Sequence, residues 1–133
     1  MDPAKGYSVV LGLGIDLLET SRVEEELSRG EWLLADGIFT AKEIAHCSSI
    51  EKPALRYAAC FTAKEATLKA LGIPVRDLSM FREIEVMPGG DSGYRVVLYS
   101  RMKAGSEQLG VRSIGLSIAH DTHQTVALVI LED

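Results

Sequence analysis

Two charged residues, Glu65 and Lys69, stand four positions apart among the alanines of the stretch FTAKEATLKALG (61–72). At roughly 100° per residue, a helix places one apolar stripe and a second apolar strip on either side of them. The first stripe comprises Leu55, Ala59, Ala63, Ala66 and Ala70, and the second comprises Tyr57, Phe61 and Leu68. The spacing allows two interpretations: an ordinary i,i+4 ion pair on a solvated face, or a carboxylate and an ammonium held for a ligand.

A third charged residue, Asp16, ends the apolar stretch SVVLGLGIDLLE (8–19), whose alternation predicts a strand. Asp16 shares one strand face with Gly12 and Gly14, which contribute no side-chain bulk, so a ligand could approach closely there. Alternatively, the glycines mark a bulge or close packing, and Asp16 only caps the strand. A dinucleotide-binding GxGxxG fingerprint is excluded because Leu17 stands where the third glycine is needed.

Asp16 and Glu65 together predict a magnesium site for a phosphate substrate. Mg²⁺ prefers oxygen ligands and is commonly held by one or two carboxylates, with waters and phosphate oxygens completing its shell. A neighbouring lysine then neutralises charge on the phosphates. A bound cation would also explain why an ionised Glu65 is tolerated between two apolar strips.

The remaining pattern places helices early and strands late. Capping boxes begin helices at Ser21 with Glu24 and at Thr40 with Glu43, the first helix ending at Gly30 and the second covering 41–47. Pro53 and Gly72 bound a long helix at 53–71. The later elements are strands 83–87 and 94–99 around a turn at 88–93, a helix at 100–110 capped by Ser100 and stopped by Gly110, and strands 113–120 and 125–131. This order predicts an α+β fold with a mainly antiparallel sheet packed against the long helix.

Length and composition limit the function classes. The 133 residues form one predicted domain, 1–133, without linkers or repeats. No run of 18 apolar residues or secretion signal occurs, which favours a soluble cytoplasmic protein without a membrane partner. The net charge of −5, with scattered basic residues, argues against nucleic-acid binding. Cys47 and Cys60 lack metal-ligand spacing and are expected to be free thiols.

Two stretches resemble the signature motifs of the 4′-phosphopantetheinyl transferases. GIDLLETSRV (14–23) resembles the family's Gly-x-Asp motif, and FTAKEATLKALG resembles its aromatic-x-x-Lys-Glu-Ala-x-x-Lys helix. The resemblance continues in register through FTAKE (39–43), REIEVM (82–87) and LSIAHD (116–121). Size and spacing are similar to the small holo-[acyl-carrier-protein] synthase branch of this family.

The resemblance implies a reaction in which the phosphopantetheine arm of coenzyme A moves to a serine of an acyl carrier protein. Adenosine 3′,5′-bisphosphate is released. Asp16 and Glu65 are then expected to hold Mg²⁺ against the coenzyme pyrophosphate, and Lys69 to pair with the phosphate under attack. Lys64 is expected either to serve the bisphosphate or only to cover the helix surface. Glu65 or a metal-activated water would deprotonate the serine.

The resemblance also assigns residues outside the two motifs. His120 is expected to contact the nucleotide or a phosphate, and Arg22, with Arg29 as a weaker candidate, to bind the acidic carrier. Three glutamates, 24–26, crowd the helix of Arg22, where a basic cluster is usual, and this leaves the identity of the carrier open. The small branch also implies a homotrimer with each active site between neighbouring subunits. His46 and His123 match no motif and are expected to be solvated.

Two departures from the family pattern bear on the coenzyme. Cys60 stands where an arginine is common, and Arg56, one turn earlier, is expected to reach the same region. Gly72-Ile73-Pro74 follows the long helix in place of Gly-Thr-Gly. They suggest a second hypothesis, a non-catalytic relative that binds coenzyme A or a carrier. A generic metal-binding domain is a third, and it leaves SIAH unexplained.

Overall fold

The computed structural model describes residues 6–29, 37–89 and 93–133. Its elements, in chain order, are β1 (Val10–Glu19), α1 (Thr20–Arg29), α2 (Ala41–Ser48), α3 (Pro53–Leu71), the 3-10 helix η2 (Leu78–Glu83), β2 (Ile84–Pro88), β3 (Tyr94–Leu98), α4 (Ser100–Leu109), β4 (Ser113–His120) and β5 (Gln124–Glu132). None of these described helices is both long and apolar enough to cross a membrane.

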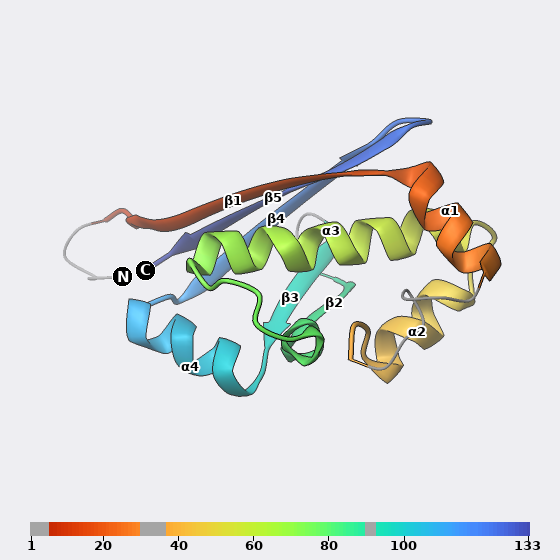
Figure 1. Cartoon of the computed structure of the whole chain (residues 1–133). Helices are drawn as coiled ribbons and strands as arrows, with labels where there is room; N and C mark the ends of the chain where they lie inside the picture. Colours follow the sequence, from red (N-terminus) through yellow and green to blue (C-terminus); the bar gives the residue numbers. More distant parts are fainter. Residues whose placement is uncertain (1–5, 30–36, 90–92) are drawn as a thin grey trace.

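The strands form two antiparallel sheets. β5 lies between β1 and β4 in the larger sheet, and β2 pairs with β3 in the smaller one. α3 runs along one face of the larger sheet, and the smaller sheet, α2 and α4 lie on the other side of α3 (Figure 1). The prediction of an α+β fold with a mainly antiparallel sheet on a long helix is confirmed.

Local signals set most of the helix boundaries. Thr40 and Glu43 form the predicted capping box of α2, and α3 begins at Pro53 and is capped at its end by Gly72, which has a left-handed φ of 70°. The prediction for α4 was wrong at its start, because Tyr99 is the N-cap and Ser100 is already helical. Similarly, α1 begins at Thr20 directly after β1, so Ser21 lies inside the helix. The predicted stop at Gly30 lies outside the described residues.

Close packing between β1 and α3 explains the two glycines of the strand. A Cβ atom on Gly12 would overlap the carbonyl oxygen of Ala70, and one on Gly14 would overlap the carbonyl oxygen of Ala66. The close-packing interpretation is therefore correct, and the sheet register also shifts between Val10 and Gly12. The expectation that a ligand approaches these glycines was wrong, because the backbone of α3 fills that space.

The opposite face of the larger sheet is apolar and exposed. Leu13, Ile15 and Leu17 of β1 are 61%, 59% and 56% exposed. They pair across the ladder with Ile130, Leu128 and Val126 of β5. In Figure 1 no described element lies over this face. Asp16, one position out of phase with these residues, faces α3 instead.

Candidate active site

Asp16 and Glu65 come together in one pocket between β1, α1 and α3. The pocket has a volume of about 390 Å³ and is lined by both carboxylates with Leu17, Leu18, Arg22 and Phe61. Asp16 reaches it because the register pairs it with Ala127 and turns its side chain toward α3. β1 and α3, which are distant in the sequence, therefore place their carboxylates side by side.

Lys69 closes this group from the next turn of α3. Its Nζ donates hydrogen bonds to Asp16 Oδ1 at 2.7 Å and to the carbonyl oxygen of Ile15 at 3.2 Å. The Lys69 side chain is 55% exposed, whereas that of Asp16 is only 12% exposed. The hydrogen bond that Lys69 donates to Asp16 raises the pKa of Lys69, so the ammonium stays charged. The ion pair thus joins a largely exposed cation to a mostly buried carboxylate of the sheet.

Glu65 has a strongly shifted acidity. Burial, and next the negative charge of Asp16, raise its pKa from 4.5 to about 7, while the positive charges of Lys69 and Arg22 oppose the shift. A carboxylate in this setting is stabilised by a proton or by a cation at neutral pH. The donor set consists of oxygens only, which fits Mg²⁺. No cluster of three or more His, Cys, Asp or Glu occurs in the described part of the chain, so substrate oxygens and waters would complete the shell.

Lys64 does not belong to this site, which corrects both expectations for it, that it serves the bisphosphate or that it covers the helix surface. Its side chain is fully buried, and its Nζ lies 2.6 Å from Glu43 Oε1. The same nitrogen donates to the carbonyl oxygens of Ile38, Phe81 and Ile84 at 3.0, 2.8 and 2.7 Å. These acceptors use its full donor capacity. Lys64 is therefore a structural cation of the core.

Cys60 lies beside the same buried pair. Its Sγ donates to Glu43 Oε2 at 3.0 Å, and the backbone N–H of Val86 donates to the same oxygen at 2.8 Å. Burial raises the pKa of the Cys60 thiol well above its usual value. Cys47 and Cys60 are both free, as predicted. The family arginine is thus replaced by a core residue, whose role is packing rather than contact with a ligand in a pocket.

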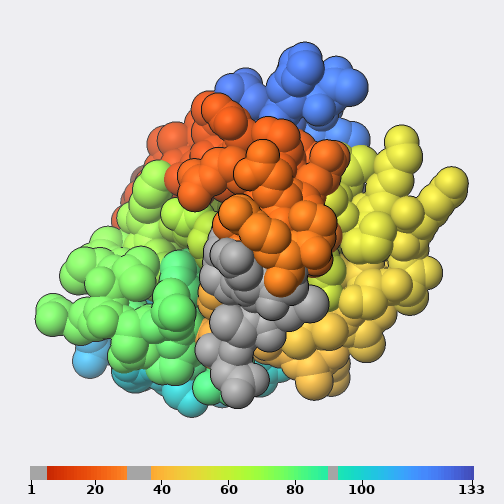
Figure 2. Space-filling view, turned by 45° about the vertical axis from the view of Figure 1, so that its right-hand side comes forward, coloured from red at the N-terminus to blue at the C-terminus, as the bar shows by residue number. Residues whose placement is uncertain are grey.

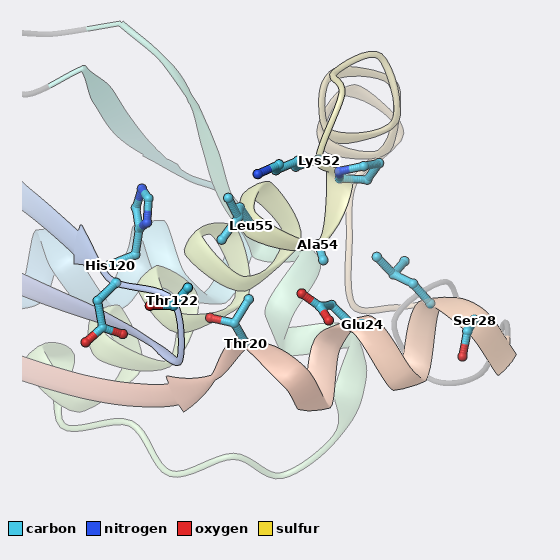
Figure 3. A pocket seen from close by; sticks show the side chains of 11 residues that line it. Thr20, Glu24, Ser28, Lys52, Ala54, Leu55, His120 and Thr122 are labelled. Carbon is cyan, nitrogen blue, oxygen red and sulfur yellow. The ribbon is translucent and has the colours of Figure 1, made fainter.

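His120 lies on the other flank of the molecule, beside a large hollow. The hollow, about 850 Å³, lies between α1, the start of α3 and the turn that joins β4 to β5. Figure 3 shows the side chains around it, including Thr20, Glu24, Lys52, Ala54, Leu55, His120 and Thr122. Figure 2 shows α1 at the surface, next to this turn, which is drawn in blue.

A smaller pocket of about 290 Å³ adjoins the hollow and shares Lys52, Leu55 and His120 with it. Arg56 also lines this pocket, and its guanidinium lies 5.2 Å from the centroid of the Tyr94 ring. Sequence reasoning missed Lys52, although a lysine directly before the proline that begins a helix was an available signal. Lys52, Arg56 and His120 thus gather on one flank, and contact of Arg56 and His120 with the coenzyme stays a prediction.

The two flanks point in different directions. Arg56 and Glu65 are nine residues apart on α3, which places them on opposite sides of the helix. Asp16 lies on β1 and His120 on β4, the two edges of the three-stranded sheet. No described residue lines both the Asp16–Glu65 pocket and the hollow at His120. The structure therefore brings together each half of the predicted site, but not the two halves.

The two arginines predicted to bind the carrier differ in their surroundings. Arg22 is exposed and lines the Asp16–Glu65 pocket, where its charge acts on Glu65. Arg29 lies at the far end of α1 and pairs with Glu26 at 3.2 Å and, more distantly, with Glu25 at 3.9 Å. Arg22 is therefore the better placed of the two to meet a partner that enters the pocket.

The two unassigned histidines also differ. His123 is exposed in the turn between β4 and β5, as expected, and its backbone N–H donates to Asp121 Oδ1. The expectation for His46 was wrong: it is half-buried, and its Nε2 has no hydrogen-bond partner within the described residues.

Comparison with known proteins identifies the family of the chain. Residues 12–127 match the family model described as the 4′-phosphopantetheinyl transferase superfamily. The chain belongs to this superfamily, and the prediction of membership is confirmed.

Individual relatives narrow the comparison. A holo-[acyl-carrier-protein] synthase of Geobacter sp. (strain M21) is 39% identical over 124 residues, which cover 93% of this chain and 99% of that protein. The crystal structure of the synthase from Neisseria meningitidis is similar with a TM-score of 0.80 and 25% identity, over 94% of this chain and 100% of the other. A Bacillus anthracis synthase in complex with CoA (3′,5′-ADP) has a TM-score of 0.73 and 26% identity, over 93% and 97%.

Proposed function

We propose that the protein transfers the 4′-phosphopantetheine group of coenzyme A to a serine hydroxyl of an apo acyl carrier protein. The products are the holo carrier and adenosine 3′,5′-bisphosphate. The observation that carries this proposal is the meeting of Asp16, Glu65 and Lys69 at one pocket. It occurs in a chain whose relatives, at up to 39% identity among those described above, are named holo-[acyl-carrier-protein] synthases.

Asp16, Glu65 and Lys69 each have a task in this reaction. Asp16 and Glu65 would hold Mg²⁺, which supplies charge neutralisation for the coenzyme pyrophosphate when it is bound. Lys69 pairs with the phosphate that the serine attacks and stabilises charge that develops on the leaving bisphosphate. The serine oxygen forms the new P–O bond as the bond to the leaving phosphate breaks. Its proton passes to Glu65 or to a water in the same pocket.

The nucleotide half of coenzyme A is assigned to the flank of His120. Apolar residues such as Leu27 and Leu55 line the hollow there and suit the flat adenine ring. Lys52 and Arg56 supply positive charge for the phosphate of the ribose, and His120 supplies a hydrogen-bonding ring nitrogen at the border of both pockets. Among these residues, Lys52 is an addition to the set expected from the sequence.

We also propose that the active protein is a homotrimer with active sites between subunits. Two features support this. One coenzyme cannot easily contact both flanks of a single chain, since Arg56 and Glu65 lie on opposite sides of α3. In addition, the exposed rows of Leu13, Ile15 and Leu17 offer an apolar face for a neighbouring copy. The carrier is expected to be acidic where it meets Arg22, and the reaction to take place in the cytoplasm without nucleic acid or membrane.

The reaction is tested by incubating the protein with coenzyme A, Mg²⁺ and an apo acyl carrier protein, and following the intact mass of the carrier. We expect a gain of one phosphopantetheine, abolished by EDTA and by Asp16→Ala or Glu65→Ala. Glu107→Ala, an exposed change on α4, is the matched control and should transfer normally. Coenzyme A binding without any gain across several carriers would instead favour the non-catalytic alternative.

The shared site has its own test. Asp16→Ala and His120→Ala should each impair transfer, and mixed oligomers of the two variants should regain activity, because one of their interfaces carries both intact halves. Mixed oligomers that stay as inactive as the single variants would contradict a site between subunits. Sedimentation of the wild-type chain measures the subunit number directly.

A further inference from the structure

The ammonium of Lys69 contacts the carboxylate of Asp16, which is the group expected to bind the metal ion. Lys69 Nζ is 2.7 Å from Asp16 Oδ1, and among the described residues Asp16 and Glu65 are the two carboxylates that line this pocket. A divalent ion bound to the same oxygen at its usual distance of about 2.1 Å would lie roughly 4 Å from the ammonium. Two cations this close repel each other strongly, so Lys69 and a divalent ion compete for Asp16.

We propose that Lys69 competes with the metal ion for Asp16 and that its ammonium moves from Asp16 to a phosphate oxygen when the substrate binds. This movement couples metal binding to phosphate binding. This inference rests on the proposed function, because it concerns the same pocket. It adds that Lys69 opposes the metal when phosphate is missing and favours the metal when phosphate is present. Lys69 is thus a determinant of the order in which the ligands of the site are held.

The surroundings of Lys69 permit such an exchange. Its side chain is 55% exposed, and its second acceptor, the carbonyl oxygen of Ile15, is a neutral group. The ammonium can therefore move to a phosphate oxygen, a charged acceptor that forms a stronger hydrogen bond than a carbonyl does. The divalent ion replaces the ammonium at Asp16, whose side chain is only 12% exposed, and water can satisfy the carbonyl oxygen of Ile15, so the exchange does not strand a buried charge.

Backbone packing between α3 and β1 sets the position from which Lys69 would move. Gly12 and Gly14 let α3 approach β1 so closely that an added Cβ would overlap the carbonyl oxygens of Ala70 and Ala66. Lys69 belongs to the same turn of α3 as these alanines, which brings its ammonium within reach of two consecutive residues of the strand, Ile15 and Asp16. The ion pair is thus a consequence of how the helix is seated.

The competition predicts a reversal of sign that a merely structural lysine would not produce. We would titrate the full-length wild type, Lys69→Met and Lys69→Arg with Mn²⁺, an ion that also prefers oxygen ligands, and follow the free ion by electron paramagnetic resonance. The titration is run at about pH 8, where Glu65 is ionised, without and with inorganic pyrophosphate. Thermal unfolding of each variant verifies that it is folded.

Without pyrophosphate, Lys69→Met should bind Mn²⁺ roughly fivefold more tightly than the wild type, the size expected when an exposed ion pair no longer has to be broken. With pyrophosphate the order should invert, and the wild type should bind more tightly. Lys69→Arg keeps the cation and should follow the wild type in the direction of both effects. Equal Mn²⁺ affinities of the wild type and Lys69→Met, or an effect of the same sign in both conditions, would overturn the competition.

The carrier-mass assay separates this inference from the proposed function. A wild type that transfers phosphopantetheine, together with a Lys69→Met variant of unchanged Mn²⁺ affinity, overturns only the competition. Loss of Mn²⁺ binding in Asp16→Ala would establish that the wild type binds the ion through Asp16. If the affinities of the wild type and Lys69→Met then reverse their order when pyrophosphate is added, the competition is supported even if no tested carrier is modified.

Discussion

α3 carries two lysine–carboxylate pairs that look alike by distance and differ in nearly everything else. Lys64 lies 2.6 Å from Glu43, and Lys69 lies 2.7 Å from Asp16. Both side chains of the first pair are fully buried, whereas Lys69 is 55% exposed. The distance between two charges therefore says little about their role, and the groups around them decide it.

The interior pair, Lys64 and Glu43, is held by other groups of the core. Lys64 donates to three carbonyl oxygens and forms an ion pair with Glu43, and the oxygens of Glu43 accept from Thr40, Cys60 and Val86. This network ties α2, α3 and β2 together, so removal of one member leaves the others buried without partners. The surface pair has water beside it. The first pair is consequently suited to hold a fold, and the second to bind and release a ligand.

The largest expected effect is on the stability of the interior pair. Lys64→Met should lower the free energy of unfolding by about 3–5 kcal/mol, because Glu43 stays buried without its cation. Chemical denaturation measures the loss. Lys69→Met is the comparison within the same helix and should cost less than about 1 kcal/mol. Similar losses for both variants would break the distinction between the two pairs.

The next effect concerns the rate of transfer, on which the surface pair rather than the interior pair should have the direct effect. Lys69→Met should reduce the rate of transfer by about 10²- to 10³-fold at saturating substrates, since a preorganised charge at the phosphate is lost. The rate is followed by the carrier mass over time, with the melting temperature of the variant determined beside it. A variant that keeps wild-type turnover would remove Lys69 from the reaction.

A smaller effect is expected when the seat of α3 on β1 is changed. Gly14→Ala should lower the free energy of unfolding by about 1–3 kcal/mol, because its Cβ overlaps the Ala66 carbonyl oxygen and the helix must shift. Gly115→Ala on β4 is the control: its Cβ would meet Ile130 only at an ordinary 3.8 Å, and the cost should stay within about 0.5 kcal/mol. Transfer should fall in Gly14→Ala, because the surface pair loses its alignment, while the interior pair keeps its contacts.

The smallest effect is the pH dependence of the surface site. The pKa of Glu65 is raised from 4.5 to about 7, so metal binding must displace a proton below that pH. Mn²⁺ affinity should be constant above about pH 7 and fall by up to about tenfold per pH unit below it. Without a divalent ion, the same shift should make the protein slightly less stable as the pH rises from 4.5 to about 7, since the folded state binds the proton more tightly. An affinity that is flat from pH 5 to 8 would contradict the raised pKa.

Sequence reasoning succeeded where the cause was local. The capping box at Thr40, the start at Pro53 and the stop at Gly72 are short-range signals, and the helix bounds they predict agree with the structure to within about two residues. Asp16, Glu65 and Lys69 were also found from the sequence, because a charged residue at the border of an apolar stripe is visible there. Each of these predictions depends only on neighbours along the chain.

Sequence reasoning failed where the environment came from distant segments. Lys64 differs from Lys69 because carbonyl groups of Ile38, Phe81 and Ile84, which lie 17 to 26 positions away, surround its ammonium. The residue pattern of α3 does not indicate that the Lys64 ammonium is surrounded by carbonyl groups. Lys52 was missed for a related reason: its importance arises from the approach of the β4–β5 turn to the start of α3. The space above Gly12 and Gly14 could be assigned to a ligand or to a helix only after the packing was known.

The pairing of Asp16 with Ala127 limits how the gene for this protein can vary. Because neighbouring side chains of a strand point to opposite faces, the loss or gain of a single codon within β1 would turn Asp16 outward and Ile15 or Leu17 toward α3. Such a change would remove the carboxylate from its pocket and break the apolar rows of the outer face at the same time. Point substitutions can alter one face of this strand alone, but the insertion or deletion of a single residue cannot.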